Sequence, residues 1–199
     1  DQAYYRLVAA HFPSVGTSAR LATQWGILSR APIIALVLPL VLWRPKFVGF
    51  QTGQIAQHRR LLLAMLLVNC SVVAAYLALT GSGTPYSGNE WLLTEIVTVP
   101  LLEETVWRGL VFSVLLALFG RVLAGGRATH LAAWSSGIAF GLLHLANAFA
   151  GVPLAFVAIQ SLSAAAWGVM YGYARARTES VYPPILLHAA MNLIVVLFV

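Results

Sequence analysis

The chain has 199 residues, of which 60% are apolar and only 9% are charged, and its formal net charge is +6. A soluble domain carries about a quarter charged residues, so this composition excludes an ordinary water-soluble globular domain. The basic residues lie between long apolar runs and form neither a basic face nor a base-reading motif, which excludes a nucleic-acid-binding protein.

Long apolar runs dominate the chain and predict an all-α polytopic bundle of about six transmembrane helices, because one span needs about 20 apolar residues. The expected spans cover residues 24–43, 61–80, 91–118, 131–149, 153–173 and 181–198. The first span is the weakest, because Arg30 interrupts it and Pro32 and Pro39 would kink it. Further spans before residue 1 remain open, since the chain begins at Asp1 without a methionine.

Turn-forming residues separate the apolar runs. Loops are expected at residues 81–88 and 120–129, and a further turn is expected at Tyr182-Pro183-Pro184, at the entry to the last span. No repeat or shift in composition marks a domain boundary. We therefore expect a single transmembrane domain, with N-terminal helices and loops over residues 1–90 and a core over residues 91–199.

Basic residues gather in alternate loops, and this asymmetry orients the bundle. Eight of them follow the first, third and fifth expected spans: Arg44, Lys46, Arg59, Arg60, Arg121, Arg127, Arg175 and Arg177. The alternate loops, 81–90 and 150–152, contain none. The positive-inside rule therefore predicts a multi-pass protein with the basic loops in the cytoplasm.

Six polar residues interrupt the later apolar runs, where a charged group costs about 2.5–3.5 kcal/mol on insertion scales. They are Glu103, Glu104 and Arg108 in the third span, His144 in the fourth, and His188 and Asn192 in the sixth. Helical rise puts polar groups of all three spans about 10–20 Å from the cytoplasmic boundary. Lipid offers them no partner, so they are expected to face a protein interior or a watered cavity.

Helix spacing sorts these side chains. Arg108 lies four residues after Glu104, on the same helix face, so the two can form a buried pair. It lies five residues after Glu103, which leaves Glu103 off that face and free to act. His188 and Asn192 are also four residues apart and point in one direction.

Three ordered motifs contain these residues: Glu103-Glu104-Thr-Val-Trp-Arg108, Phe140-Gly-Leu-Leu-His144 and His188-Ala-Ala-Met-Asn192. The set resembles the CPBP family of intramembrane proteases, which includes the type II CaaX prenyl endopeptidases and proteins of bacteriocin processing or self-immunity. The resemblance covers about residues 91–199. The N-terminal half supports it only through its hydrophobicity.

The resemblance implies an intramembrane endopeptidase of the glutamic type. Glu103 and His144 would hold and deprotonate a water that attacks the scissile carbonyl. His188 and Asn192 would donate hydrogen bonds to the developing oxyanion. The remaining motif residues would support these four: Glu104, Arg108 and Phe140.

Metal dependence is left open by the resemblance, because related proteins have been described both as metalloproteases and as glutamic proteases. Glu103, His144 and His188 could ligate a divalent ion. The zinc-protease signature His-Glu-x-x-His is absent, however. We therefore expect metal-free glutamate catalysis and no other cofactor.

The expected partners are membrane lipid and a protein or peptide substrate with a lipidated or apolar C-terminal tail. The expected location is a bacterial or archaeal cytoplasmic membrane. Prenylated CaaX tails, bacteriocin leaders and C-terminal sorting tags all stay open as substrates. Two other functions also stay open: a non-catalytic membrane scaffold or bacteriocin self-immunity protein, and a small membrane transporter, for which buried ionisable residues are also expected.

Overall fold

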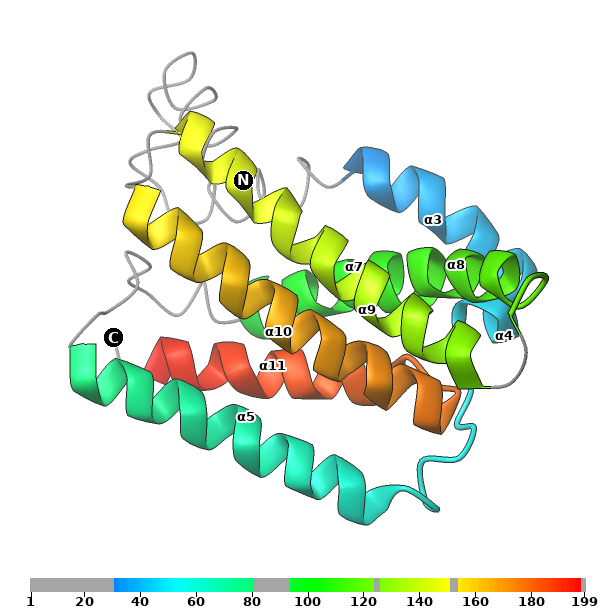
Figure 1. Ribbon diagram of the computed structural model, residues 1–199, viewed down its shortest axis with the longest axis horizontal. Helices are drawn as coiled ribbons and strands as arrows, with labels where there is room; N and C mark the ends of the chain where they lie inside the picture. The colour runs from blue at the N-terminus through cyan, green and yellow to red at the C-terminus, as the bar shows by residue number, and fades with distance from the viewer. Residues whose placement is uncertain (1–30, 81–93, 124–125, 151–153, 198–199) are drawn as a thin grey trace.

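The computed structural model describes residues 31–80, 94–123, 126–150 and 154–197, and the described chain is all-helical (Figure 1). Its elements are α3 (Ala31–Trp43), α4 (Pro45–Val48), α5 (Arg59–Thr80), the π-helical η2 (Thr94–Thr98), α7 (Val99–Glu104), the π-helical η3 (Thr105–Val111), α8 (Phe112–Phe119), α9 (Gly126–Leu143), the 3₁₀ helix η4 (His144–Ala150), α10 (Leu154–Thr178) and α11 (Tyr182–Leu197). The expected loop at 81–88 and the part of the first expected span before residue 31 lie outside the described residues.

The all-α prediction is confirmed, whereas the number of spans is not. Two described helices are long and apolar enough to cross a membrane, namely α5 over Arg59–Leu79 and α10 over Leu154–Thr178. Two shorter apolar helices are Pro32–Trp43 within α3 and Tyr182–Leu197, which is α11. The six-span bundle therefore remains a prediction.

Element boundaries differ from the expected ones mainly around α9. This helix begins at Gly126, so residues 126–129 are helical rather than part of the expected loop. Its α-helical part ends at Leu143, and the chain winds into the tighter η4 from His144 onward. At the other predicted turn, α11 does start at Tyr182; its two prolines lie in the first turn, where a missing N–H breaks no helical bond.

Two π-helical segments flank the six-residue α7, which ends at Glu104. Pro100 lies in α7 and has no N–H to bond the carbonyl of Ile96, and the wider η2 winding ends two residues before it. Such π-helical turns are rare and recur at functional sites. The local winding thus singles out the same stretch as the polar sequence pattern.

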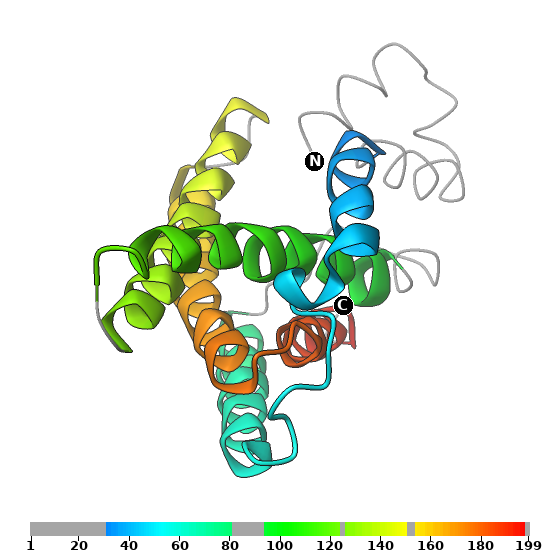
Figure 2. The same cartoon turned by 90° about the vertical axis from the view of Figure 1, so that its right-hand side faces the viewer.

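Close helix packing fixes the centre of the bundle. Helices α9 and α10 run side by side (Figure 1), and small residues line their contact. A Cβ atom added at Gly168 would lie 2.9 Å from Cα of Gly137, and one at Gly172 would lie 3.0 Å from Cα of Ala133. Small residues let helix backbones approach in this way. Figure 2 shows the α7–α8 segment crossing this pair.

Helix α11 packs against α5, α10, α7 and η2. Its Leu187 is buried together with Tyr171 and Ala174 of α10, and Met65 of α5 packs against this cluster. The next residue along α11 is His188, whose side chain is also buried. Packing therefore brings a polar side chain of the last helix into the interior of the bundle.

Candidate active site

A carboxylate, a guanidinium and an imidazole meet in the interior. Oε1 of Glu104 lies 3.1 Å from Nη1 of Arg108 and 2.8 Å from Nδ1 of His188. Glu104 and Arg108 are 0% exposed and His188 is 5% exposed. We call these three residues the buried polar cluster. One carboxylate oxygen thus accepts hydrogen bonds from two separate helical segments.

The Glu104–Arg108 ion pair confirms the pairing predicted from their i to i+4 spacing. Arg108 also lies over two aromatic rings, at 4.7 Å from the ring of Phe140 and 5.6 Å from the ring of Tyr171. A guanidinium is attracted by the electron-rich faces of such rings. Aromatic residues of α9 and α10 therefore help to hold the cation that neutralises Glu104.

Three buried atoms of this cluster have no hydrogen-bond partner among the described residues: Oε2 of Glu104, and Nε and Nη2 of Arg108. Buried polar atoms of folded proteins are nearly always hydrogen-bonded to protein or to ordered water. The cluster therefore offers both an acceptor and donors for water or a substrate group.

His144 opens η4 and is half-buried. Its Nδ1 lies 2.9 Å from the backbone oxygen of Phe140, and the two rings meet edge to face at 4.8 Å. Phe140 therefore packs beside His144, as their spacing of four residues allows. Because a carbonyl oxygen only accepts, Nδ1 carries the proton, so Nε2 of a neutral His144 presents a lone pair.

Glu103 and Asn192 lie outside the hydrogen-bond contacts of the buried polar cluster. Glu103 is half-buried, and no hydrogen bond or ion pair joins it to another described residue. Asn192 donates a hydrogen bond of 2.7 Å from Nδ2 to the backbone oxygen of Glu95, which ties α11 to η2. Contacts thus join Glu104, Arg108 and His188 directly, whereas no hydrogen bond among the described residues links Glu103 or Asn192 to either imidazole.

The three residues that would ligate a metal ion if one were present do not form a metal site. In the described part of the chain, no group of three or more His, Cys, Asp and Glu side chains could hold a metal ion. Glu103, His144 and His188 therefore do not fit a shared ion as they are placed. The two imidazoles could each ligate a metal ion, because Nδ1 of both His144 and His188 is hydrogen-bonded and Nε2 is left available.

Two buried polar residues next to the cluster were missed by the sequence analysis. Tyr171 of α10 stacks on His188, with ring centroids 5.9 Å apart and an interplanar angle of 30°. Its hydroxyl donates a hydrogen bond of 3.3 Å to Oδ1 of Asn69, which is 0% exposed on α5. A lone asparagine within the apolar run 61–80 was the available signal.

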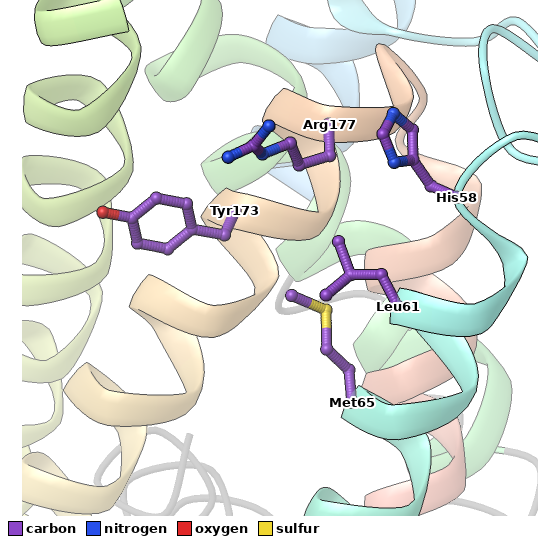
Figure 3. A pocket seen from close by; sticks show the side chains of 5 residues that line it. All are labelled: His58, Leu61, Met65, Tyr173 and Arg177. Atoms are coloured by element: carbon purple, nitrogen blue, oxygen red, sulfur yellow. The ribbon is translucent and has the colours of Figure 1, made fainter.

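An open pocket of about 280 Å³ lies between the start of α5 and the end of α10 (Figure 3). Its lining consists of His58, Leu61, Met65, Tyr173 and Arg177. It contains no residue of the buried polar cluster and no carboxylate, so it does not supply the groups that hydrolysis needs. We treat it as a separate feature.

Fold and site together define a helical protein with ionisable groups buried among apolar helices. The chain belongs to the Rce1-like family, described as type II CAAX prenyl endopeptidase Rce1-like, whose family model matches residues 89–194. The match contains all three motifs, from Glu103 to Asn192, and confirms the expected resemblance. It is a family of membrane-bound proteases. The chain matches no curated protein sequence and no solved structure.

Proposed function

We propose that this chain is a multi-pass intramembrane endopeptidase, which hydrolyses a peptide bond of a membrane-associated protein or peptide. The observation that carries the proposal is the buried contact of Glu104 with Arg108 and His188 inside the family-matched region. Buried ionisable groups among apolar helices are expensive and by default indicate function. Here they come from two separate helical segments and meet at one oxygen atom.

Water activation falls to Glu103 and His144 in this proposal. Glu104 is a poor base, because its Oε1 already accepts from a guanidinium and from an imidazole. The Glu103 carboxylate has no such partner among the described residues, so both of its oxygens are available to a water. The Nε2 lone pair of His144 can accept a hydrogen bond from the same water. A base that takes the water proton lets the oxygen attack the scissile carbonyl carbon.

Oxyanion stabilisation falls to His188 and Asn192. Nδ1 of His188 donates to the Glu104 carboxylate, so Nε2 can donate only when the ring is protonated. Asn192 uses one N–H on the Glu95 carbonyl, and its second N–H is left for a ligand. Two such donors aimed at the developing oxyanion lower the barrier to hydrolysis.

The substrate class follows from the family and from the apolar surroundings of the site. A family of CAAX prenyl endopeptidases suggests a peptide whose C-terminal tail is lipidated or apolar. The exposed faces of α5 and α10 are rich in large apolar residues, which suits contact with lipid and with such a tail. We therefore propose that cleavage occurs near the end of a substrate that reaches the bilayer.

Peptide hydrolysis by the purified full chain in proteoliposomes tests this proposal. The probes are a farnesylated CaaX peptide and an unprenylated peptide with an apolar C-terminal tail, each read by mass spectrometry. Glu103→Gln and His144→Ala are expected to reduce cleavage at least 100-fold while membrane insertion is unchanged. Glu179→Gln is the matched control, because Glu179 is exposed and accepts hydrogen bonds from Gln51 and Gln54, away from the buried polar cluster.

Full cleavage by Glu103→Gln and by His144→Ala would overturn the assigned roles. If the unaltered chain cleaves neither probe, two further measurements separate the remaining functions. Substrate-dependent flux into the same liposomes would indicate a transporter. Genetic complementation by a Glu103→Ala variant would indicate a scaffold or self-immunity protein.

A further inference from the structure

Asn69 is a fully buried amide on α5, a helix that lies outside the family-matched region 89–194. Within α5 it shares a face with Val73 and Leu77, which are buried at i+4 and i+8. The rest of α5 is largely exposed and apolar. An amide among apolar side chains is costly unless it is hydrogen-bonded, so the contacts of Asn69 show what it is for.

Both polar atoms of Asn69 are engaged, and each contacts a different helix. Nδ2 donates a hydrogen bond of 2.7 Å to the backbone oxygen of Leu187 on α11. Oδ1 accepts a hydrogen bond of 3.3 Å from the hydroxyl of Tyr171 on α10. One side chain of α5 thus bridges the last two helices of the chain. Leu187 directly precedes His188.

Tyr171 extends this bridge to the buried polar cluster. Its ring lies nearly parallel to the ring of His188 at 5.9 Å and also faces the guanidinium of Arg108 at 5.6 Å. The Tyr171 ring is 1% exposed, so it has no room to rotate away. It therefore covers one face of the imidazole, while Glu104 holds Nδ1.

We propose that Asn69 and Tyr171 are positioning residues for His188. Asn69 fixes the backbone carbonyl before His188 and the Tyr171 hydroxyl at the same time, so the imidazole is held from its main chain and from its ring face. Nδ1 of His188 then stays hydrogen-bonded to Glu104, and Nε2 of the same ring keeps a fixed orientation. The inference rests on the proposed function for the role of His188 in hydrolysis. The contacts of Asn69 and Tyr171 that hold the imidazole, which we call the Asn69–Tyr171 bracket, are a property of the fold.

The proposal gives α5 a specific part in the site. Its single buried amide acts on α10 and α11 over sequence separations of 102 and 118 residues. A helix needed only as an apolar wall would place an aliphatic side chain at this position, since Leu has nearly the shape of Asn and needs no partner.

Three variants of the full chain test the Asn69–Tyr171 bracket: Asn69→Leu, Tyr171→Phe and the double variant. Tyr173→Phe is the matched control, because it removes a hydroxyl two residues further along α10 whose hydrogen bonds to described residues are those with His130 and Trp134. The first measurement is histidine side-chain NMR of ¹⁵N-labelled protein in detergent, with the His188 signals assigned by their loss in His188→Gln. It reports the tautomer and ring environment of His188 without any need for proteolysis.

The second measurement is hydrolysis of the peptide probes. We expect Asn69→Leu to shift the His188 signals and to lower kcat about 10- to 100-fold, with KM within about twofold, since small displacements of a catalytic group lower the chemical step. Tyr171→Phe keeps the stacked ring and should lower kcat about threefold. The double variant should resemble Asn69→Leu, because both substitutions remove one shared hydrogen bond.

Unchanged His188 signals in both single variants would overturn the inference, as would an equal change in Tyr173→Phe. Losses of kcat that add up in the double variant would also contradict the inference, because the two residues would then act independently. If no protein, altered or not, hydrolyses the probes, the proposed function fails, but the NMR comparison still decides whether Asn69 and Tyr171 position the imidazole.

Discussion

Nε of Arg175 donates a hydrogen bond of 3.2 Å to the backbone oxygen of Arg108, in the middle of the π-helical segment η3. Arg175 is 7% exposed, and its Nη2 reaches the hydroxyl of Ser113 at 3.4 Å and the carbonyl of Phe47 at 3.5 Å. A carbonyl in an irregular turn needs such an outside donor. Helix α10 thus supports the turn that carries Arg108.

Arg175→Leu is therefore expected to destabilise the fold by about 1–3 kcal/mol, because it removes the side-chain donor of the buried Arg108 carbonyl. Thermal unfolding of the detergent-solubilised protein measures the effect. Arg177→Leu serves as control, since Arg177 is exposed and lies outside these contacts. Equal unfolding temperatures for the two variants would contradict the support that we assign to Arg175.

Glu104→Gln removes the charge that Arg108 and His188 share. We expect activity to fall at least 100-fold and stability to fall by about 3–5 kcal/mol, because the buried guanidinium loses its counter-charge. Adding Arg108→Met removes that unpaired charge and should restore stability without restoring activity. Peptide hydrolysis and thermal unfolding of the single and double variants separate the two effects. Recovery of both in the double variant would show that the pair serves folding alone.

Asn192→Ala deletes one proposed oxyanion donor. We expect kcat to fall about 100- to 1,000-fold with little change in KM, as for other single oxyanion donors. Steady-state hydrolysis over a range of peptide concentrations gives both constants. Asn147→Ala is the matched control, because the Asn147 amide bonds Gln160 at 2.8 Å and not the buried polar cluster. A rise in KM with unchanged kcat would instead assign Asn192 to substrate binding.

Chelation tests the metal question directly. Because Glu103, His144 and His188 form no group that could hold a metal ion in the described part of the chain, hydrolysis is expected to persist after dialysis against EDTA and 1,10-phenanthroline. Elemental analysis of the purified protein provides a second readout. Loss of activity that returns on adding Zn²⁺ would contradict glutamate catalysis without metal and would require these side chains to converge.

Local contacts could be predicted from the sequence because helix geometry alone sets them. The Glu104–Arg108 pair and the packing of Phe140 on His144 both follow from spacing of four residues. The start of α11 followed from its two prolines. Each of these features depends on one helix and not on how helices pack.

Other features depend on tertiary packing or on local winding and could not be predicted. The contact of His188 with Glu104 joins residues 84 positions apart. The pattern of apolar residues does not show which side chains of two separate helices face each other. The π turns around α7 leave the apolar pattern unchanged, so the sequence does not reveal them. Asn69 carried a usable signal, but its partners are set by the arrangement of α5, α10 and α11.

Gly168, at the contact of α9 with α10, also borders the guanidinium. A Cβ atom there would lie 2.7 Å from Nη2 of Arg108 as well as against Gly137. Even a methyl group would thus require the guanidinium or one of the two helices to shift, because protein interiors are close-packed. A residue without any functional group therefore governs the electrostatics of the site, and substitutions as mild as alanine at this position should be excluded by natural selection.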